Sequence, residues 1–212
     1  MKVEAEKLRR IVIEELKADA AYETVLPEMT SKIPLIPPPP AGSPEEILEL
    51  YAVMEQYQNR VVPEELQQMC DEDLVGVFQK TLEEVGISIN YSYYNKLKDD
   101  IRKPYKKLKK LFNRRRPYKL AAALGIEFQW DDLPSAKSKS YPSGHTVQSY
   151  VVAHFLADLH PEHSDRIFAT AELISQSRVD RGVHYQSDLD YGRIVAEYVY
   201  KEVANVLEVS DE

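Results

Sequence analysis

The sequence predicts an all-α protein built as a single compact helical domain. Apolar residues recur at helical spacing between recognisable start and stop signals, and alternating strand patterns bounded by turn residues are missing. One stretch interrupts this pattern: IPLIPPPPAGS, residues 33 to 43, contains four consecutive prolines and cannot be helical. We interpret it as an extended strap lying across the domain, with a proline-rich ligand for a partner protein as the alternative.

The helix that follows this strap has the clearest start signal in the chain. Ser43 is expected to cap it, because Pro44 suits the first helical position and Glu46 follows the cap by three residues. The helix is predicted to run to about Asn59.

Further helices are predicted from apolar spacing and from the glycine or proline at their ends. The longest stretch is expected to break at Pro104, and Ser187 is expected to cap the last helix. The predicted ranges are one that opens at Pro63, then 71 to 85, 91 to 112, 146 to 159, 164 to 180 and 187 to 207.

The composition is that of an ordinary soluble globular protein, with 43% hydrophobic and 29% charged residues. The 212 residues suffice for one core, which we place in residues 31 to 212, preceded by a helical appendage at residues 1 to 30. No apolar run approaches the roughly 20 residues that span a bilayer, and the N-terminus lacks the apolar core of a secretory signal. The only cysteine is Cys70. We therefore expect no disulfide, no membrane partner and a cytoplasmic location.

Charge is unevenly distributed along the chain. The net charge of −8 argues against a nucleic-acid partner. Residues 102 to 119, RKPYKKLKKLFNRRRPYK, are nevertheless intensely basic. A basic strip in an acidic protein calls for a specific anion or partner, although most of its lysines are interpreted as a solvated helix face.

Three short motifs bear on one another. The first places Lys109 seven residues before Arg116-Pro117, a spacing expected to put both cations on one helix face. The second is PSGH, residues 142 to 145, where turn residues open into a helix whose free N–H groups suit an anion. The third motif comprises Ser177-Arg178, His184 and Asp188. Each motif alone has an ordinary structural explanation, but all three in this order are hard to ascribe to chance.

The cations and turn residues of these motifs suit one kind of ligand. Lys109, Arg116 and Arg178 can surround the oxygens of a tetrahedral oxyanion. The N–H groups around Ser143 and Gly144 can complete that set.

The histidines suit proton transfer and nucleophilic attack beside such an anion. His145 and His184 supply one nucleophile and one proton donor. Asp188 can hold the Nδ1–H of a histidine, which leaves Nε2 unprotonated and aimed outward. The remaining histidines have no acidic ligand set around them in the sequence, so no metal site is expected there. They are His154, His160 and His163.

The three motifs, as they stand here, resemble the type 2 phosphatidic acid phosphatase and vanadium haloperoxidase superfamily. Residues 140 to 146, SYPSGHT, and the prolines 37 to 40 ahead of a tyrosine-containing helix resemble the class A bacterial non-specific acid phosphatases. The resemblance implies an all-α domain with its site among helix ends. It also implies hydrolysis of a small phosphorylated substrate through a phosphohistidine, with no metal or other cofactor and with vanadate binding as a transition-state mimic.

The same resemblance implies a role for each site residue. His184 would be the nucleophile, Asp188 its orienting partner and His145 the general acid for the leaving group. The remaining residues would hold the phosphoryl oxygens: Lys109, Arg116, Arg178, Ser143 and Gly144.

Three other functions are compatible with parts of this pattern. A vanadate-dependent haloperoxidase would use the same cup of cations, and a lipid phosphatase the same motifs, although its relatives usually embed them in membrane helices. A non-catalytic phosphate- or partner-binding module would need the cations but neither His145 nor the pair of His184 and Asp188. The tyrosines of residues 91 to 94 are interpreted as core packing or as a homodimer face.

Overall fold

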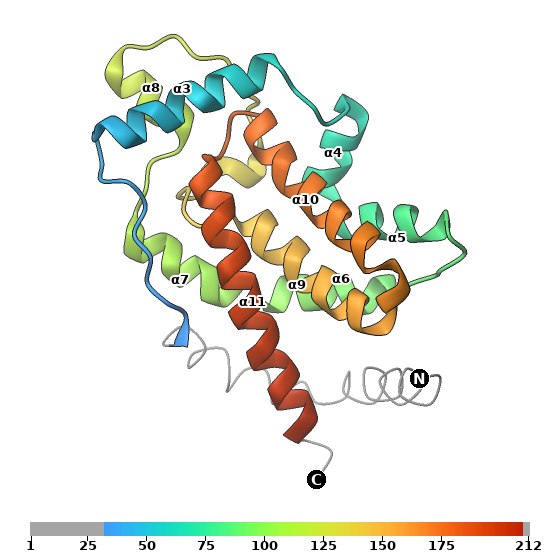
Figure 1. Ribbon diagram of the computed structural model, residues 1–212. Helices are drawn as coiled ribbons and strands as arrows, with labels where there is room; N and C mark the ends of the chain where they lie inside the picture. The colour runs from blue at the N-terminus through green and yellow to red at the C-terminus, as the bar shows by residue number, and fades with distance from the viewer. Residues whose placement is uncertain (1–31, 210–212) are drawn as a thin grey trace.

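The computed structural model describes residues 32 to 209, and every regular element within them is helical (Figure 1). The predicted all-α fold is therefore confirmed, while the predicted appendage of residues 1 to 30 lies outside the described residues. No helix in the described part is long and apolar enough to cross a membrane. The helices are α3 (Pro44–Gln58), α4 (Glu64–Glu72), α5 (Leu74–Glu83), α6 (Tyr91–Asp100), α7 (Arg102–Phe112), α8 (Pro117–Leu124), α9 (Gly144–Leu159), α10 (Ser164–Asp180) and α11 (Gln186–Val209), with 3₁₀ turns at Pro134–Lys137 and Pro161–His163.

Helix α9 lies at the centre of the molecule, between α10 and α11 (Figure 1). Its residues are buried on nearly every face and most of the buried ones are apolar, as expected for a helix enclosed by others. At the α9–α11 crossing, a Cβ on Gly192 would lie 2.9 Å from Cβ of Thr146, so only glycine permits this approach. The second motif, at the start of α9, is therefore held directly against α11.

The strap is an extended segment, as expected, and two tyrosines fix it to the domain. Tyr191 on α11 donates its hydroxyl to the carbonyl oxygen of Pro34 at 3.0 Å, and Tyr141 donates to Ile36 at 2.8 Å. The rings of Tyr141 and Tyr191 stack with centroids 4.7 Å apart. The first part of the strap is thus held against α11 and against the segment that leads into α9.

The predicted start of α3 is confirmed. Ser43 Oγ accepts the N–H of Glu46 at 3.3 Å, and the Glu46 carboxylate accepts the N–H of Gly42 at 2.8 Å. Tyr93 and Tyr94 are buried, which confirms core packing for these two, whereas Tyr91 is exposed.

Two predicted helices are each divided in two. Residues 71 to 85 do not form one helix, because Asp73 stops α4 and caps α5 by accepting the N–H of Gly76 at 3.0 Å. Residues 91 to 112 break at Ile101 and not at Pro104. Proline lacks an N–H, so it lies in the first turn of α7, where that donor would have no helical partner.

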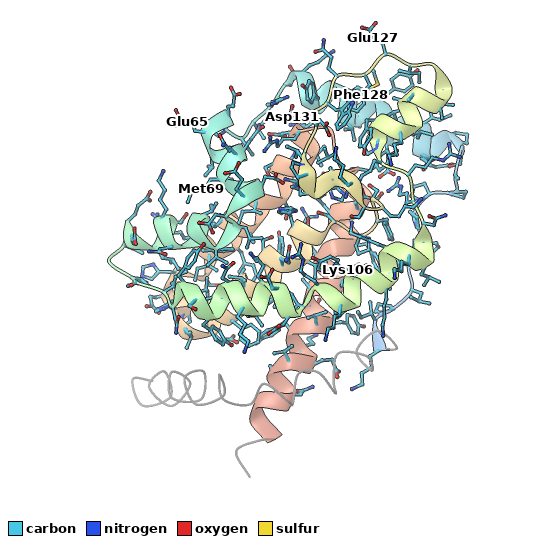
Figure 2. All side chains as sticks on the ribbon, turned by 180° about the vertical axis from the view of Figure 1, so that it is seen from behind. Glu65, Met69, Lys106, Glu127, Phe128 and Asp131 are labelled. Carbon is cyan, nitrogen blue, oxygen red and sulfur yellow. The ribbon has the colours of Figure 1, made fainter. Side chains whose placement is uncertain are left out.

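The start of the last helix also differs from the prediction. α11 begins at Gln186, so Ser187 is a first-turn residue and not the cap, and its N–H donates to Glu49 on α3 at 3.1 Å. Sequence reasoning overlooked α8, which is short and ends at Gly125 with φ of 68°. The segment that follows α8 is held by Asp131, labelled in Figure 2, which pairs with Arg60 and Arg181.

Candidate active site

The three motifs converge where five helices begin or end. Lys109 lies in the last turn of α7, and Arg116 directly precedes α8. The PSGH motif opens α9, Arg178 lies in the last turn of α10, and His184 stands just before α11. Helix ends present unpaired backbone groups, so this arrangement concentrates polar atoms in one place.

A tight turn after α10 places His184 beside Arg178. Gly182 has φ of 70°, and its N–H donates to the carbonyl of Val179 at 2.8 Å, while Val183 N–H donates to the carbonyl of Arg178 at 3.1 Å. This pair of hydrogen bonds is the Schellman pattern that commonly ends helices at glycine. The turn therefore reverses the chain directly after α10 and sets the position of His184 relative to Arg178.

Asp188 orients His184. The carboxylate accepts from His184 Nδ1 at 2.9 Å and from the backbone N–H of Tyr185 at 3.0 Å. It also accepts from the hydroxyl of Ser140 and from Arg114 Nη1, the latter at 2.8 Å. Because Asp188 accepts on both oxygens, Nδ1 of His184 is the protonated nitrogen, and Nε2 carries the lone pair.

Arg116 lies against that lone pair. Its Nη1 is 2.7 Å from Nε2 of His184 and 2.7 Å from the carbonyl oxygen of Val183, and its Nε donates to Ser138 at 2.8 Å. Burial, followed by the charges of Arg116 and Lys109, holds the pKa of His184 well below its ordinary value. The imidazole of His184 is therefore neutral, with Nε2 directed at a cation.

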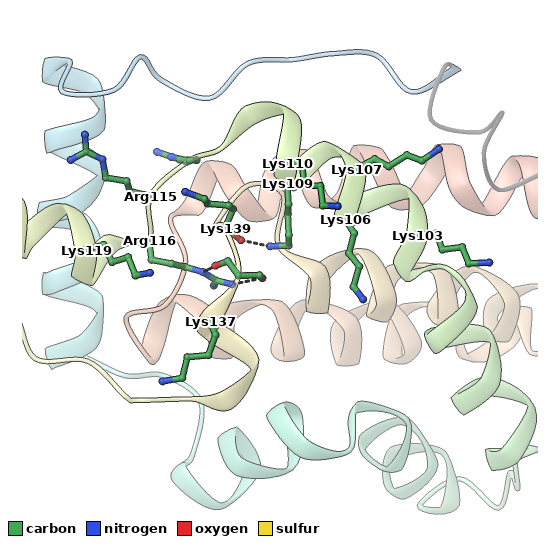
Figure 3. A pocket seen from close by; sticks show the side chains of 12 residues that line it. Lys103, Lys106, Lys107, Lys109, Lys110, Arg115, Arg116, Lys119, Lys137 and Lys139 are labelled. Carbon is green, nitrogen blue, oxygen red and sulfur yellow. Dashed lines mark hydrogen bonds between the residues drawn. The ribbon is translucent and has the colours of Figure 1, made fainter.

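Lys109 is buried and donates only to neutral oxygens among the described residues. Its Nζ is 2.7 Å from the carbonyl of Lys139 and 3.1 Å from that of Ser140 (Figure 3). The prediction that it shares a helix face with Arg116 is wrong, because α7 ends at Phe112 and a loop through Asn113 in the left-handed region joins the two. Lys109 and Arg116 nevertheless line the same cavity.

The amides at the start of α9 fall into two groups. Ser143 N–H donates to the backbone carbonyl of Asp188 at 2.9 Å. The sequence suggested that this N–H would be free for an anion, and it is not. Ser143 Oγ caps the helix by accepting from the N–H of Thr146. The N–H groups of Gly144 and His145 have no acceptor in the part of the chain that the structure describes. These two amides point outward at the positive end of α9.

Asp71, at the end of α4, is a site residue that no motif indicated. Its Oδ1 lies 2.7 Å from Arg178 Nη1 and 3.7 Å from His145 Nε2, and its backbone carbonyl lies 3.3 Å from the same nitrogen. Burial opposes ionisation of Asp71, but Arg178, Ser135 and His145 outweigh it and lower the pKa of the carboxyl. Burial and Arg178 lower the pKa of His145, while Asp71 acts in the opposite direction.

Arg178 is completely buried and is shared between Asp71 and Ser135. Its Nη2 donates to Ser135 Oγ at 2.9 Å, while its Nε has no acceptor in the described part of the chain. A buried guanidinium with a free donor is suited to binding a further anionic oxygen.

Arg114 is the second residue that sequence reasoning missed. It stands between Lys109 and Arg116 in the basic strip, yet it pairs with Asp188 at 2.8 Å and with Glu49 at 2.5 Å. Its guanidinium lies 3.8 Å from the centroid of the Tyr185 ring. Arg114 therefore supports the orienting carboxylate and does not face the anion.

Comparison with known proteins identifies the family of the chain. The family model described as PAP2 superfamily matches residues 102 to 208, which hold all three motifs. The chain therefore belongs to the PAP2 superfamily.

Curated relatives match over shorter segments. A non-specific acid phosphatase of Providencia stuartii is 46% identical over 61 residues, which cover 29% of this chain and 25% of the relative. A non-specific acid phosphatase of Salmonella typhi is 38% identical over 41% of this chain and 34% of its own length, and an acid phosphatase of Zymomonas mobilis is 36% identical over 40% and 32%. The matched segments thus span a quarter to a third of these relatives. A transmembrane PAP2-type phosphatidylglycerolphosphate phosphatase from Bacillus subtilis is 18% identical, with a TM-score of 0.41 over 95% of this chain and 92% of that chain, a likeness too low to carry weight.

Proposed function

We propose that this protein is a metal-independent phosphoric monoester hydrolase of the acid phosphatase type, acting on small phosphate esters through a phosphohistidine. One observation carries the proposal. The buried cation Arg116 contacts the unprotonated Nε2 of His184, a second buried cation, Lys109, acts electrostatically on the same imidazole, and neither cation has a carboxylate partner among the described residues. Buried cations without a counter-ion are costly, so the site favours an anion beside the nucleophile. The acid phosphatase names of the relatives agree with this chemistry.

The first step would form a bond from His184 Nε2 to phosphorus and break the ester P–O bond. The electron pair leaves with the ester oxygen, which takes a proton from His145. Asp188 holds Nδ1 and stabilises the positive imidazole that forms. In the second step water attacks the phosphohistidine while the now neutral His145 acts as general base and takes a proton from that water. The P–N bond breaks, and inorganic phosphate, neutral His184 and protonated His145 return.

Three cations would stabilise the charge that develops on the phosphoryl oxygens. Lys109, Arg116 and Arg178 are fixed by carbonyl, hydroxyl and carboxylate contacts before substrate arrives, so little reorganisation accompanies the reaction. The same charges repel a divalent cation. Vanadate, which adopts the five-coordinate geometry of phosphoryl transfer, should bind there as an inhibitor.

The direction of the histidine pKa shifts favours acidic pH. A lowered pKa keeps His184 neutral, and hence nucleophilic, well into the acidic range. A lowered pKa also means that His145 in the free protein holds its proton only at acidic pH. Since the general acid must be protonated and the nucleophile must not be, kcat/KM should fall as the pH rises.

The test is hydrolysis of p-nitrophenyl phosphate with and without EDTA, and with orthovanadate. Turnover should survive EDTA and stop with vanadate. Complete loss in EDTA with recovery on adding a divalent ion would contradict the proposal. A parallel assay of bromide oxidation by peroxide in the presence of vanadate would reveal a haloperoxidase instead.

A further inference from the structure

A cavity of about 610 Å³ opens beside the phosphoryl site, and its lining is almost entirely cationic (Figure 3). Among the described residues twelve line it: eleven are lysine or arginine, the other is Ser138, and none is acidic. Such a wall has a strong positive field, because the cavity concentrates the potential of charges that lie within a Debye length of about 8 Å.

The cavity adjoins the proposed reaction centre, since Lys109 and Arg116 belong to its lining, whereas His145, Arg178 and His184 are not among the described residues that line it. Arg114 is occupied by its carboxylate partners. Around these three, the wall is built from several elements. Lys103, Lys106, Lys107 and Lys110 follow one face of α7, Arg115 lies in the loop after it, Lys119 on α8, and Lys137 and Lys139 on the segment before α9.

Most of these rim cations lack an acidic partner of their own. Lys137 pairs with Asp132, but six of the others have no carboxylate within ion-pair distance among the described residues. A solvated helix face in an acidic protein normally carries charges of both signs. The single sign here indicates a ligand. The six are Lys106, Lys107, Lys110, Arg115, Lys119 and Lys139.

We propose that the preferred substrates carry at least one further phosphate group besides the one that reacts, and that the cavity binds it. This inference rests on the proposed function and narrows its substrate class. The reacting phosphoryl group would occupy the site of Lys109 and Arg116, and the second phosphate would lie among the rim lysines of α7. The chemistry is unchanged: Nε2 of His184 bonds to phosphorus, the P–O bond to the leaving group breaks, and His145 protonates that oxygen.

The test compares fructose 1,6-bisphosphate with fructose 6-phosphate, measured as released phosphate at low ionic strength. We expect kcat/KM to be at least about tenfold higher for the bisphosphate, because several cations act together on the extra dianion. Raising the salt concentration to 0.5 M, where the Debye length falls to roughly 4 Å, should reduce this preference sharply.

Variants locate the preference. The triple variant Lys106→Ala, Lys107→Ala, Lys110→Ala removes exposed side chains of α7 and should bring the ratio close to one. The matched control replaces three exposed lysines outside the cavity with alanine and should keep the wild-type ratio. These control lysines are Lys80, Lys96 and Lys201.

The outcomes separate the inference from the proposed function. Vanadate-sensitive hydrolysis of p-nitrophenyl phosphate without any preference for the bisphosphate would overturn the inference alone. No hydrolysis of any ester would remove both. A third outcome is that the wild-type protein sediments with phosphatidylglycerol vesicles while the triple variant does not, and that it shows no preference for the bisphosphate. That result would assign the cations to a membrane surface and would also overturn the inference.

Discussion

Replacing Asp71 with asparagine should shift the alkaline limb of the kcat/KM–pH profile to lower pH. The Asp71 carboxylate lies 3.7 Å from Nε2 of His145 and raises the pKa of that histidine against burial and Arg178. Without the negative charge the imidazolium is less stable, so His145 loses its proton at a lower pH. Asparagine keeps the size of the side chain and can still accept a hydrogen bond from Arg178.

The separation of the two groups sets the size of the shift. At 3.7 Å, unit charges interact by about 1 kcal/mol in a water-like medium and by about 4 kcal/mol at an effective dielectric constant of 20. Since about 1.4 kcal/mol corresponds to one pH unit, the limb should move by about one to three units. Initial rates of phosphate release from glycerol phosphate, whose alkoxide leaving group needs the proton of His145, measure it from pH 3 to 9. Glu72→Gln, an exposed neighbour with the same charge change, is the control. A limb that stays in place, or moves to higher pH, would refute the role of Asp71.

Two substitutions test other parts of the site. Arg178→Lys keeps the charge but loses the planar guanidinium, so kcat for p-nitrophenyl phosphate should fall at least about tenfold. The surface control Arg166→Lys should keep the wild-type kcat. A wild-type kcat in Arg178→Lys would mean that this arginine is only structural. Gly144→Ala would bring a Cβ to 3.0 Å from the Tyr105 ring, so the melting temperature should fall by about 2–4 °C for each 1 kcal/mol of crowding, as calorimetry would show. Tyr105→Leu in the same chain should reverse part of that loss, and no interaction between the two changes would contradict the contact.

Features set by neighbouring residues could be predicted from the sequence. The Ser43 cap follows from residues three apart. The contact of His184 with Asp188 follows from their i, i+4 spacing at a helix start. The extended strap follows from proline alone, since four prolines exclude a helix.

Features set by tertiary contact could not. Asp71 meets Arg178 across 107 residues, and Arg114 meets Asp188 across 74. Nothing in the sequence distinguishes Arg114 from its neighbour Arg115 in the basic strip, because only the fold turns one of them toward carboxylates. The assignment of most strip lysines to a solvated face also overlooked that several line one cavity.

The central claim is that His184 forms the bond to phosphorus, and rapid-quench labelling tests it most directly. Protein is mixed with ³²P-labelled p-nitrophenyl phosphate and quenched, and nitrophenolate release is compared with acid-labile phosphate on the protein. His184→Ala should show neither burst nor label. His145→Ala should show a burst and then stall with label retained, because nitrophenolate leaves without a proton but water then lacks its base. Label or a burst in His184→Ala, with none in His145→Ala, would contradict the account.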